Sequence, residues 1–290
     1  MFDLRYHVAS LAAVFLALLI GILVGVGISG KADEARNEEL RREIADLRGR
    51  LESAADNRAG LQQAHEADKA FAEDVYPVLI EDRLRGMRIA LLFVGSVDAA
   101  HVQRALEDAG ATRLRMRALR IPVDPEKLDR ALVGRADLAE YRGEDRLDDL
   151  GRLLAAELVT GGDTPAWDAL TSQIVEEKSG TFRRAADGVV VVRTAKPQAG
   201  PTARFLTGLY AGLADSAVPA VGAETAAENP SAVGVWNRAG LSSVDNVDTA
   251  AGRLALALLL AGGDGGQYGI KDSADDVLPP IEALPAEARG

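Results

Sequence analysis

The stretch Met87–Gly95 reads MRIALLFVG, a nearly unbroken apolar run that ends in glycine. A run of this length and composition suits a strand that is buried on both faces, as strands are in parallel sheets. A second run with the same character, Gly188–Thr194, reads GVVVVRT. We expect these two segments to form the centre of an α/β sheet.

Segments with helical patterns lie between and after these strands. Asp98 is expected to cap a helix over Ala99–Ala109, which Gly110 would close, and Asp248 to cap the last helix. Further helices are predicted at Leu147–Val159, Ala166–Glu177, Thr202–Leu213 and Thr249–Ala261, and short strands at Ala217–Ala223 and Ala232–Trp236. The alternation predicts a mostly parallel α/β sheet with helices on both faces.

The segment Arg113–Ile121 alternates between arginine and apolar residues. In a strand, Arg113, Arg115 and Arg117 would share one face, and the apolar residues between them would share the other. The pattern predicts a half-exposed strand near a sheet edge, where solvated arginines discourage pairing with another strand. Binding of an anionic partner is the alternative role for these arginines.

An uncharged segment of 21 residues, Val8–Ile28, reads VASLAAVFLALLIGILVGVGI. At ~1.5 Å per residue a helix of this length crosses a hydrocarbon core about 30 Å thick. We therefore predict a single transmembrane helix within residues 1–30, with the lipid bilayer as a partner. A cleaved signal peptide is the alternative, although the apolar region of such a peptide is normally about 7–15 residues long. Gly21 and Gly25 form a G-x-x-x-G pair that can bring two membrane helices together, or they are ordinary helix glycines.

Residues 31–80 are predicted to form a helical stalk. Leu40, Ile44, Leu47 and Leu51 recur at 4-3-4 spacing, which is the seam pattern of a parallel coiled coil. The stalk is therefore expected to join two copies of the chain as a homodimer. A single solvated helix packed on its own body is the alternative. The pair Tyr76-Pro77 is expected to interrupt this helix, because proline disfavours a helical residue before it.

The remaining chain divides into an α/β domain at 81–270 and an acidic tail at 271–290 that contains three prolines. Little regular structure is expected in the last dozen residues. More lysine and arginine follows the predicted span than precedes it, so the positive-inside rule alone favours a cytoplasmic body.

Composition excludes several classes of function. The formal net charge is −11, which argues against nucleic acid as a partner, because a basic face supplies most of that affinity. The chain has no cysteine, and its three histidines, His7, His65 and His101, are scattered. No Walker, H-E-x-x-H or G-x-S-x-G motif is present, so we predict no catalytic residues, no cofactor and no enzyme. Asp245, Asn246 and Asp248 could bind a hard cation, but capping the following helix is the simpler role.

The two ends of the chain resemble the actinobacterial copper transporter MctB family. The similar elements are R-Y-H at Arg5–His7 before the apolar helix, V-D-N-V-D-T at Val244–Thr249, and Tyr268-Gly269 followed by Leu278-Pro279. The resemblance implies an envelope protein with an exported body and a role in copper efflux or homeostasis, with a copper ion as a possible partner. No copper ligand can be carried over, so the metal ligands are unknown.

Two further functions are compatible with the residues. One is a coiled-coil envelope scaffold without enzymatic activity, whose α/β body binds another protein. The other is a small-molecule sensor or enzyme that uses the crevice at the carboxyl ends of the parallel strands, near Gly95, Ser96 and Asp98.

Overall fold

The computed structural model describes residues 4–281, with the backbone alone in 4–6 and 26–35. The chain divides into two compact units, Met1–Lys69 and Ala70–Gly290. The predicted domain limits at residues 30, 80 and 270 are based on changes in the composition of the sequence, and they stay predictions. Residues 282–290, which make up most of the predicted irregular tail, lie outside the described part.

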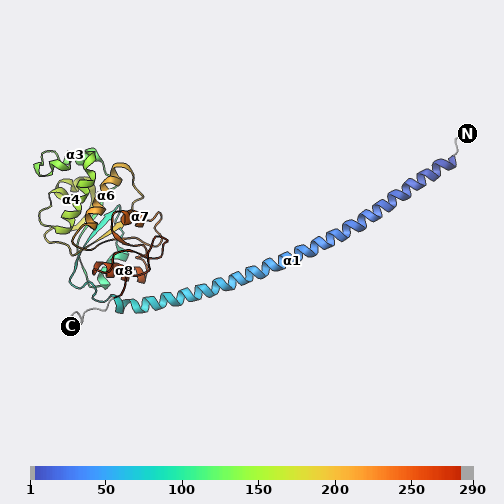
Figure 1. Ribbon diagram of the computed structural model, residues 1–290, viewed down its shortest axis with the longest axis horizontal. Helices are drawn as coiled ribbons and strands as arrows, with labels where there is room; N and C mark the ends of the chain where they lie inside the picture. The colour runs from blue at the N-terminus through green and yellow to red at the C-terminus, as the bar shows by residue number, and fades with distance from the viewer. Residues whose placement is uncertain (1–3, 282–290) are drawn as a thin grey trace. The chain divides into compact units, whose positions relative to one another are not determined.

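A single helix, α1 (Leu4–Ile80), runs through the predicted span and the predicted stalk (Figure 1). The expected interruption at Tyr76-Pro77 is wrong, because Pro77 lies inside the last turn of this helix. A proline inside a helix costs about 3 kcal/mol. Packing of the last turn offsets this cost, since Tyr76 and Ile80 are buried and the Tyr76 hydroxyl donates to Asp108 Oδ2 at 2.8 Å.

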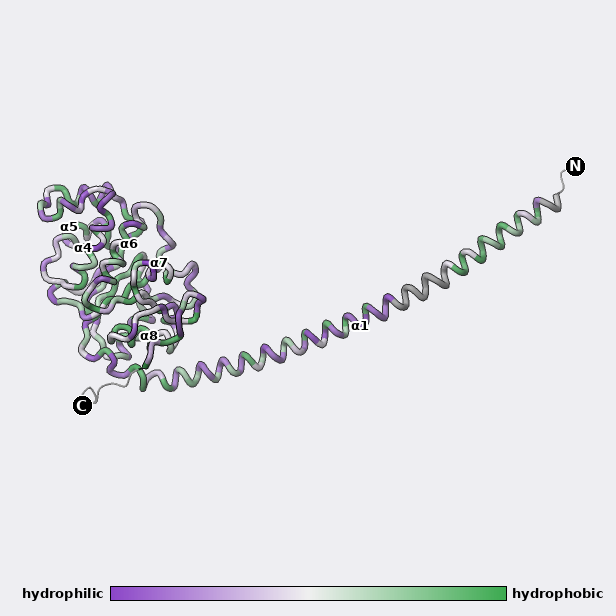
Figure 2. Tube along the Cα trace, viewed as in Figure 1, coloured by the Kyte–Doolittle hydropathy of each residue, from purple (hydrophilic) through white to green (hydrophobic). Residues whose placement is uncertain are grey.

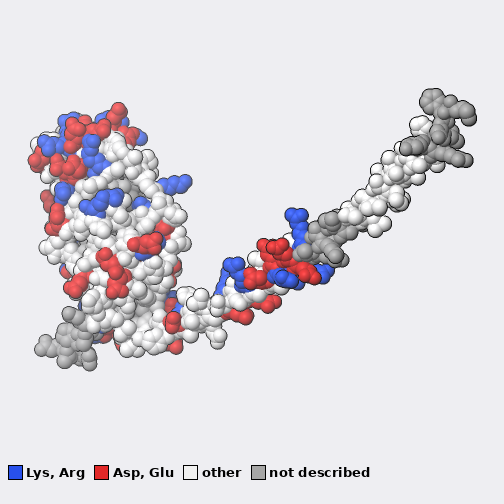
Figure 3. All heavy atoms as spheres, turned by 45° about the vertical axis from the view of Figure 1, so that its right-hand side comes forward, with Lys and Arg blue, Asp and Glu red and all other residues white. Residues whose placement is uncertain are grey.

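The N-terminal part of α1 contains an apolar window, His7–Gly25, with a mean hydropathy of 2.7. Its length and composition suffice to cross a membrane, and none of it is buried within the structure. Figure 2 shows this window as a mostly hydrophobic segment, and Figure 3 shows charged side chains of both signs further along α1, beyond the residues drawn in grey. The side chains of 26–28, at the end of the predicted span, are not described.

The body contains a seven-stranded sheet within the described residues, in the order β3-β2-β1-β4-β5-β6-β7. All neighbouring strands pair in parallel except β2 and β3, which are antiparallel. The strands are β1 (Arg88–Val94), β2 (Thr112–Leu119), β3 (Val175–Gly180), β4 (Gly188–Arg193), β5 (Ala220–Ala223), β6 (Ser242–Val244) and β7 (Gln267–Tyr268). The predicted mostly parallel α/β sheet is confirmed.

Helices cover both faces of the sheet, and the central strands supply alternate side chains to each layer (Figure 1). Ala90, Leu92 and Val94 of β1 pack in one core with α4, α5, α6 and α7. Ile89, Leu91 and Phe93 pack in the other core with α2, α8 and the last turn of α1. The helices of the body are α2 (Ala100–Asp108), α3 (Pro125–Ala131), α4 (Leu147–Thr160), α5 (Pro165–Ile174), α6 (Gly200–Ala214), α7 (Val233–Arg238) and α8 (Ala250–Leu260). Two 3-10 helices, η1 (Ala136–Tyr141) and η2 (Glu144–Arg146), precede α4.

One predicted helix extends too far, and one predicted strand has the wrong type. The helix expected at Ala166–Glu177 ends at Ile174, and the chain continues as the antiparallel edge strand β3, which finds its hydrogen-bond partners on β2. The segment Ala232–Trp236, expected to be a strand, lies at the start of helix α7. Trp236 packs so closely on β5 that a Cβ on Gly222 would lie 2.4 Å from its ring, and the strand that pairs next to β5 is β6 instead.

The arginine strand also differs from the prediction. β2 does lie near an edge, since only β3 lies outside it in the sheet, but it is not half exposed, because Arg115 and Arg117 are buried. The register between β1 and β2 shifts after Arg113, which places that residue opposite Ile89 and on the other face from Arg115. The Arg115 and Arg117 guanidinium groups lie 4.8 and 4.4 Å from the centre of the Phe182 ring. Burial lowers the pKa of Arg115 to about 10, and the nearby charges of Arg117 and Arg88 act in the same direction.

Both predicted helix caps are wrong. Helix α2 follows Ala99, and no side chain caps it. Helix α8 is capped by Thr249, whose hydroxyl accepts from the Gly252 N–H at 3.0 Å. Asp248 lies one residue too early for this position, and its carboxylate accepts from the Ala226 N–H at 2.8 Å instead.

Candidate functional site

The order of the strands creates a crevice at the carboxyl ends of β1 and β4. The chain leaves β1 towards α2 on one face of the sheet and leaves β4 towards α6 on the other. Ligands of open α/β sheets bind where neighbouring connections diverge in this way. This position is the one expected from the sequence near Gly95, Ser96 and Asp98, and Asp98 lines the crevice.

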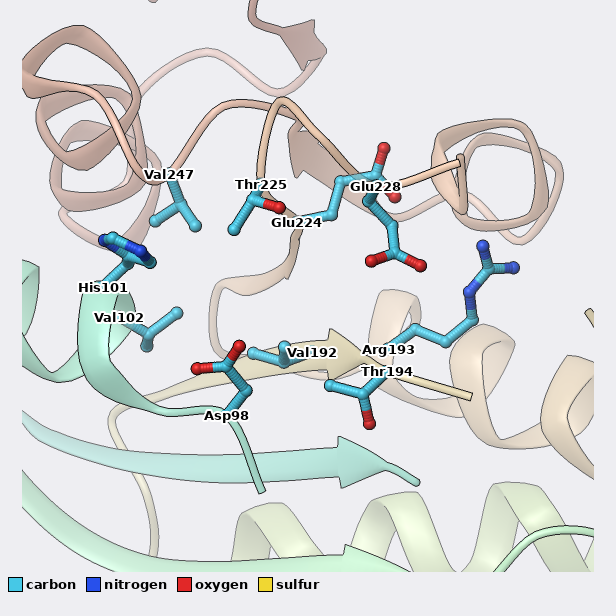
Figure 4. A pocket seen from close by; sticks show the side chains of 10 residues that line it. All are labelled: Asp98, His101, Val102, Val192, Arg193, Thr194, Glu224, Thr225, Glu228 and Val247. Atoms are coloured by element: carbon cyan, nitrogen blue, oxygen red, sulfur yellow. The ribbon is translucent and has the colours of Figure 1, made fainter. Parts of the chain in front are cut away.

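Polar side chains from three segments line this crevice (Figure 4). Asp98 lies just before α2 and His101 lies in its first turn, Thr194 follows β4, and Glu224 and Glu228 follow β5. The cavity measures about 40 Å³, which holds only a few water molecules. Figure 4 shows the Glu228 carboxylate pointing into this space and the Arg193 guanidinium lying on the far side from Asp98 and His101.

Glu224 lines the crevice and forms an ion pair with Lys271. Its carboxylate is 2% exposed and lies 2.6 Å from Lys271 Nζ. The same ammonium donates to the carbonyl oxygens of Thr225 at 3.2 Å and Glu228 at 2.9 Å. The Glu224 carboxylate also accepts from Ser231 Oγ and the Ala232 N–H. Both carboxylate oxygens of Glu224 and the ammonium of Lys271 are thus engaged, so this ion pair holds the loop after β5 in place.

Asp245 fixes the glycine-rich segment at the end of the sheet. Its two carboxylate oxygens accept from the backbone N–H groups of Ile270 and Lys271 at 2.8 and 3.0 Å. Gly269 has φ +146°, and a Cβ there would lie 1.9 Å from Asp245 Oδ1. Asp245 and Asp248 therefore both accept hydrogen bonds from backbone N–H groups and hold neighbouring segments in place.

No group of three or more histidine, cysteine, aspartate or glutamate side chains is arranged to hold a metal ion in the part of the chain that the structure describes. His7 and His65 are exposed on α1, and His101 lies at the crevice. Met116 is buried in the core. The structure therefore brings none of these soft or borderline ligands together.

The predicted assembly residues all lie on α1. Leu40, Ile44 and Leu47 are each about half exposed, and Leu51 is 70% exposed. A Cβ added to Gly21 or Gly25 would meet no atom within 4 Å. The coiled-coil seam and the glycine contact stay predictions.

Sequence reasoning missed Glu224, Lys271 and Arg193. The Glu224–Lys271 pair joins residues 47 positions apart, and the segment between them has no motif that would reveal the contact. Arg193 did carry a signal, because it is the single charge that ends the apolar strand GVVVVR. Such a residue lies at the carboxyl edge of the sheet, where ligands bind.

Comparison with known proteins gives matches along nearly the whole chain. The family model "Copper transport outer membrane protein, MctB" matches residues 1–279. The chain is also 28% identical over 316 residues to Copper transporter MctB of Mycobacterium bovis and of Mycobacterium tuberculosis strain H37Rv. Each alignment covers 96% of this chain and 99% of the relative, so the similarity includes the apolar helix, the stalk and the body.

Proposed function

The chain belongs to the MctB family of copper transport outer membrane proteins, and from this premise we propose that it serves copper efflux or homeostasis at the cell envelope. A single membrane-spanning helix, His7–Gly25, anchors it, and the α/β body lies outside the cytoplasm. The observation that carries the proposal is the family match over residues 1–279, which includes both the anchor and the body.

Copper levels in cells test this proposal. A strain that lacks the gene is expected to retain more copper and to grow less well in copper-containing medium than its parent. Expression of the full-length chain should reverse both effects. A matched variant, Leu16→Arg with Leu19→Arg, places two charges in the span, and each charge costs about 2.5–3.5 kcal/mol near the middle of a membrane helix. Expression of this variant should restore neither copper content nor growth. Equal copper content with and without the gene contradicts the proposal.

The protein acts without a soft-ligand copper site of its own. Cu(I) selects thiolate and thioether ligands, and this chain has no cysteine and three methionines. Titration of the full-length protein in detergent with Cu(I), in competition with a chelator, should therefore show no stoichiometric binding. One Cu(I) bound per chain, with affinity lost in a His7→Ala, His65→Ala, His101→Ala variant, contradicts this part of the proposal.

The body acts by binding rather than by catalysis, as a non-enzymatic scaffold. Support comes from the stalk, where Leu40, Ile44, Leu47 and Leu51 expose apolar side chains at coiled-coil spacing. Membrane anchoring raises the local concentration of copies, which favours pairing of two stalks. A dimer of this kind would present two bodies to a protein partner in the envelope.

A further inference from the structure

A second hollow lies on the opposite side of the β4 end from the crevice of Figure 4. It is lined mainly by α6 and α7 and by the loop that follows β4, and it measures about 150 Å³. Leu206 and Tyr210 of α6 and Trp236 of α7 give it an apolar and aromatic wall. Strand alternation directs Arg193 to this face, because Val189 and Val191 pack in the core that contains α6 and α7.

The charged residues that line this hollow are all cations. They are Arg193, Lys196 and Arg238. The chain as a whole has a net charge of −11, so a pocket with three cations and no carboxylate is contrary to the general charge of the protein. Convergent cations of this kind attract an anion and provide donors for charge-assisted hydrogen bonds.

Arg193 is the residue that points to a ligand. It is 6% exposed, and its guanidinium donates to the carbonyl oxygen of Pro230, while its Nε is buried without an acceptor. Within residues 36–281, where side chains are described without a gap, Arg193 forms no ion pair. Glu224 and Glu228 line the neighbouring crevice together with Arg193, but neither forms an ion pair with it. A buried cation without an ion-pair partner is costly, and an anion bound in the hollow would offset that cost.

The start of α6 adds a second source of positive potential beside the hollow. No side chain caps this end, and no acidic residue lies in its first turn. The first N–H groups of a 15-residue helix such as α6 carry partial positive charge. Ala203, Leu206 and Thr207, all within the first two turns, line the hollow.

We propose that this hollow, the Arg193 pocket, binds a small organic anion that has one phosphate or carboxylate group and a flat apolar portion. The anionic group pairs with Arg193, Lys196 and Arg238. The flat portion packs against Tyr210 and Trp236, which supply large apolar surfaces. This role is separate from copper transport, and its test does not depend on copper.

Calorimetric titration of the full-length protein in detergent with phenyl phosphate tests the proposal. We expect saturable binding that weakens as salt concentration rises, and binding of inorganic phosphate or phenol that is at least about 10-fold weaker, because each probe offers only half of the contacts. Arg193→Gln should weaken phenyl phosphate binding by about 10-fold or more, as expected for loss of a charged hydrogen bond.

Lys196→Gln and Arg238→Gln provide the same test at exposed positions, where folding is not at risk. Each should weaken binding by several-fold, roughly as expected for a charged hydrogen bond at the surface. The matched control is Arg130→Gln, an exposed arginine on α3 that lines no part of the hollow, and it should leave binding unchanged. Absence of binding at millimolar phenyl phosphate overturns the proposal. Equal affinity for inorganic phosphate, or an equal loss in Arg130→Gln, overturns it as well.

Discussion

At the scale of single residues, buried charge holds the carboxyl edge of the sheet together. Glu224 and Lys271 meet there across 47 residues of sequence, and both are engaged by backbone groups as well as by each other. Removal of one member of a buried pair leaves the other charge without compensation, which is more costly than loss of the pair as a whole.

We predict that Lys271→Met destabilises the body by about 3–5 kcal/mol, the cost of leaving the Glu224 carboxylate buried without its cation. Urea denaturation of the full-length protein in detergent measures this change. The double variant Glu224→Gln with Lys271→Met should recover part of the loss, and Lys178→Met, at an exposed lysine of β3, should change stability by less than about 0.5 kcal/mol. A loss of similar size in the double variant would contradict this account of the pair.

A surface pair at the other end of β1 predicts a pH effect. Arg88 donates to Asp187 through Nε and Nη2, each at 2.8 Å, and this guanidinium lowers the pKa of the Asp187 carboxyl. A lowered folded pKa means that the pair stabilises the fold above the ordinary aspartate pKa of about 3.9 and stops doing so as pH falls through the folded value.

Asp187→Asn should therefore lower stability at about pH 6 by up to about 1 kcal/mol, because the pair is one-third exposed and partly screened by solvent. The difference from the wild type should shrink as pH falls through the lowered folded-state pKa of Asp187, because the wild-type carboxyl is then also protonated. Denaturation curves at about pH 6 and at a series of lower pH values measure it, with Asp272→Asn at an exposed position as the control. A difference that stays constant down to low pH would show that the charge is not its cause.

At the scale of elements, glycines let helices α4 and α6 approach closely. A Cβ on Gly208 would lie 2.0 Å from the Asp148 carbonyl oxygen, and a Cβ on Gly151 would lie 2.4 Å from that of Phe205. The atoms that each added Cβ would contact belong to the backbone, which cannot change rotamer as a flexible side chain can. The packing of this helix pair therefore requires glycine at both positions.

Gly208→Ala is expected to destabilise the body by about 1–3 kcal/mol, the usual cost of forcing extra atoms into a packed core. Gly234→Ala in α7 is the matched control, since its nearest neighbour would be Arg238 Nη1 at 3.7 Å, the end of a flexible side chain. Thermal unfolding of the two variants distinguishes them. If both variants melt at the same temperature, the close approach of α4 and α6 is not maintained by Gly208.

The stalk makes a prediction about assembly. The chain has no native cysteine, so a single introduced cysteine reports directly on pairing. In a parallel dimer with Leu40, Ile44, Leu47 and Leu51 at the seam, Leu47→Cys should form an interchain disulfide in membranes under mild oxidation. Ser53→Cys, two residues beyond the seam residue Leu51 and on the outer face, should not. Equal crosslinking at both positions, or at neither, would contradict a dimer with this seam.

Much of the α/β body could be predicted from the sequence. β1 and β4 are buried on both faces, so their residues are almost all apolar and the segments stand out. The short strands β3 and β6 have polar residues and few ladder partners, and their conformation depends on pairing with β2 and β5. The arginines of β2 misled the prediction because one register shift and the Phe182 ring allow Arg115 and Arg117 to be buried.

The sequence predicts where the candidate site lies but not most of the residues that line it. Asp98 lies at the crevice, as the general rule for parallel sheets indicates. Its other lining residues come from loops after β4 and β5, whose neighbours in space are far apart in the sequence. The Arg193 pocket is formed where α6 and α7 pack near the end of β4. No local pattern in the sequence predicts this packing.

At the scale of the whole molecule, the proposed function requires one helix that crosses a membrane and an α/β body on the outer side. Lysine and arginine near the span favour a cytoplasmic body, whereas membership of a family of copper transport outer membrane proteins supports an exported one. The orientation decides which partners the body can meet, and so it decides whether the protein can act in copper transport out of the cell.

The most direct test is labelling of one introduced cysteine, Glu144→Cys, at an exposed position of the body. The reagent is a maleimide that does not cross membranes, and the cells are intact spheroplasts that contain the full-length chain. Our account predicts labelling in intact spheroplasts to the same extent as after lysis, on a protein that stays with the membrane fraction. Labelling only after lysis would place the body in the cytoplasm and contradict the account, as would recovery of the protein in the soluble fraction without detergent.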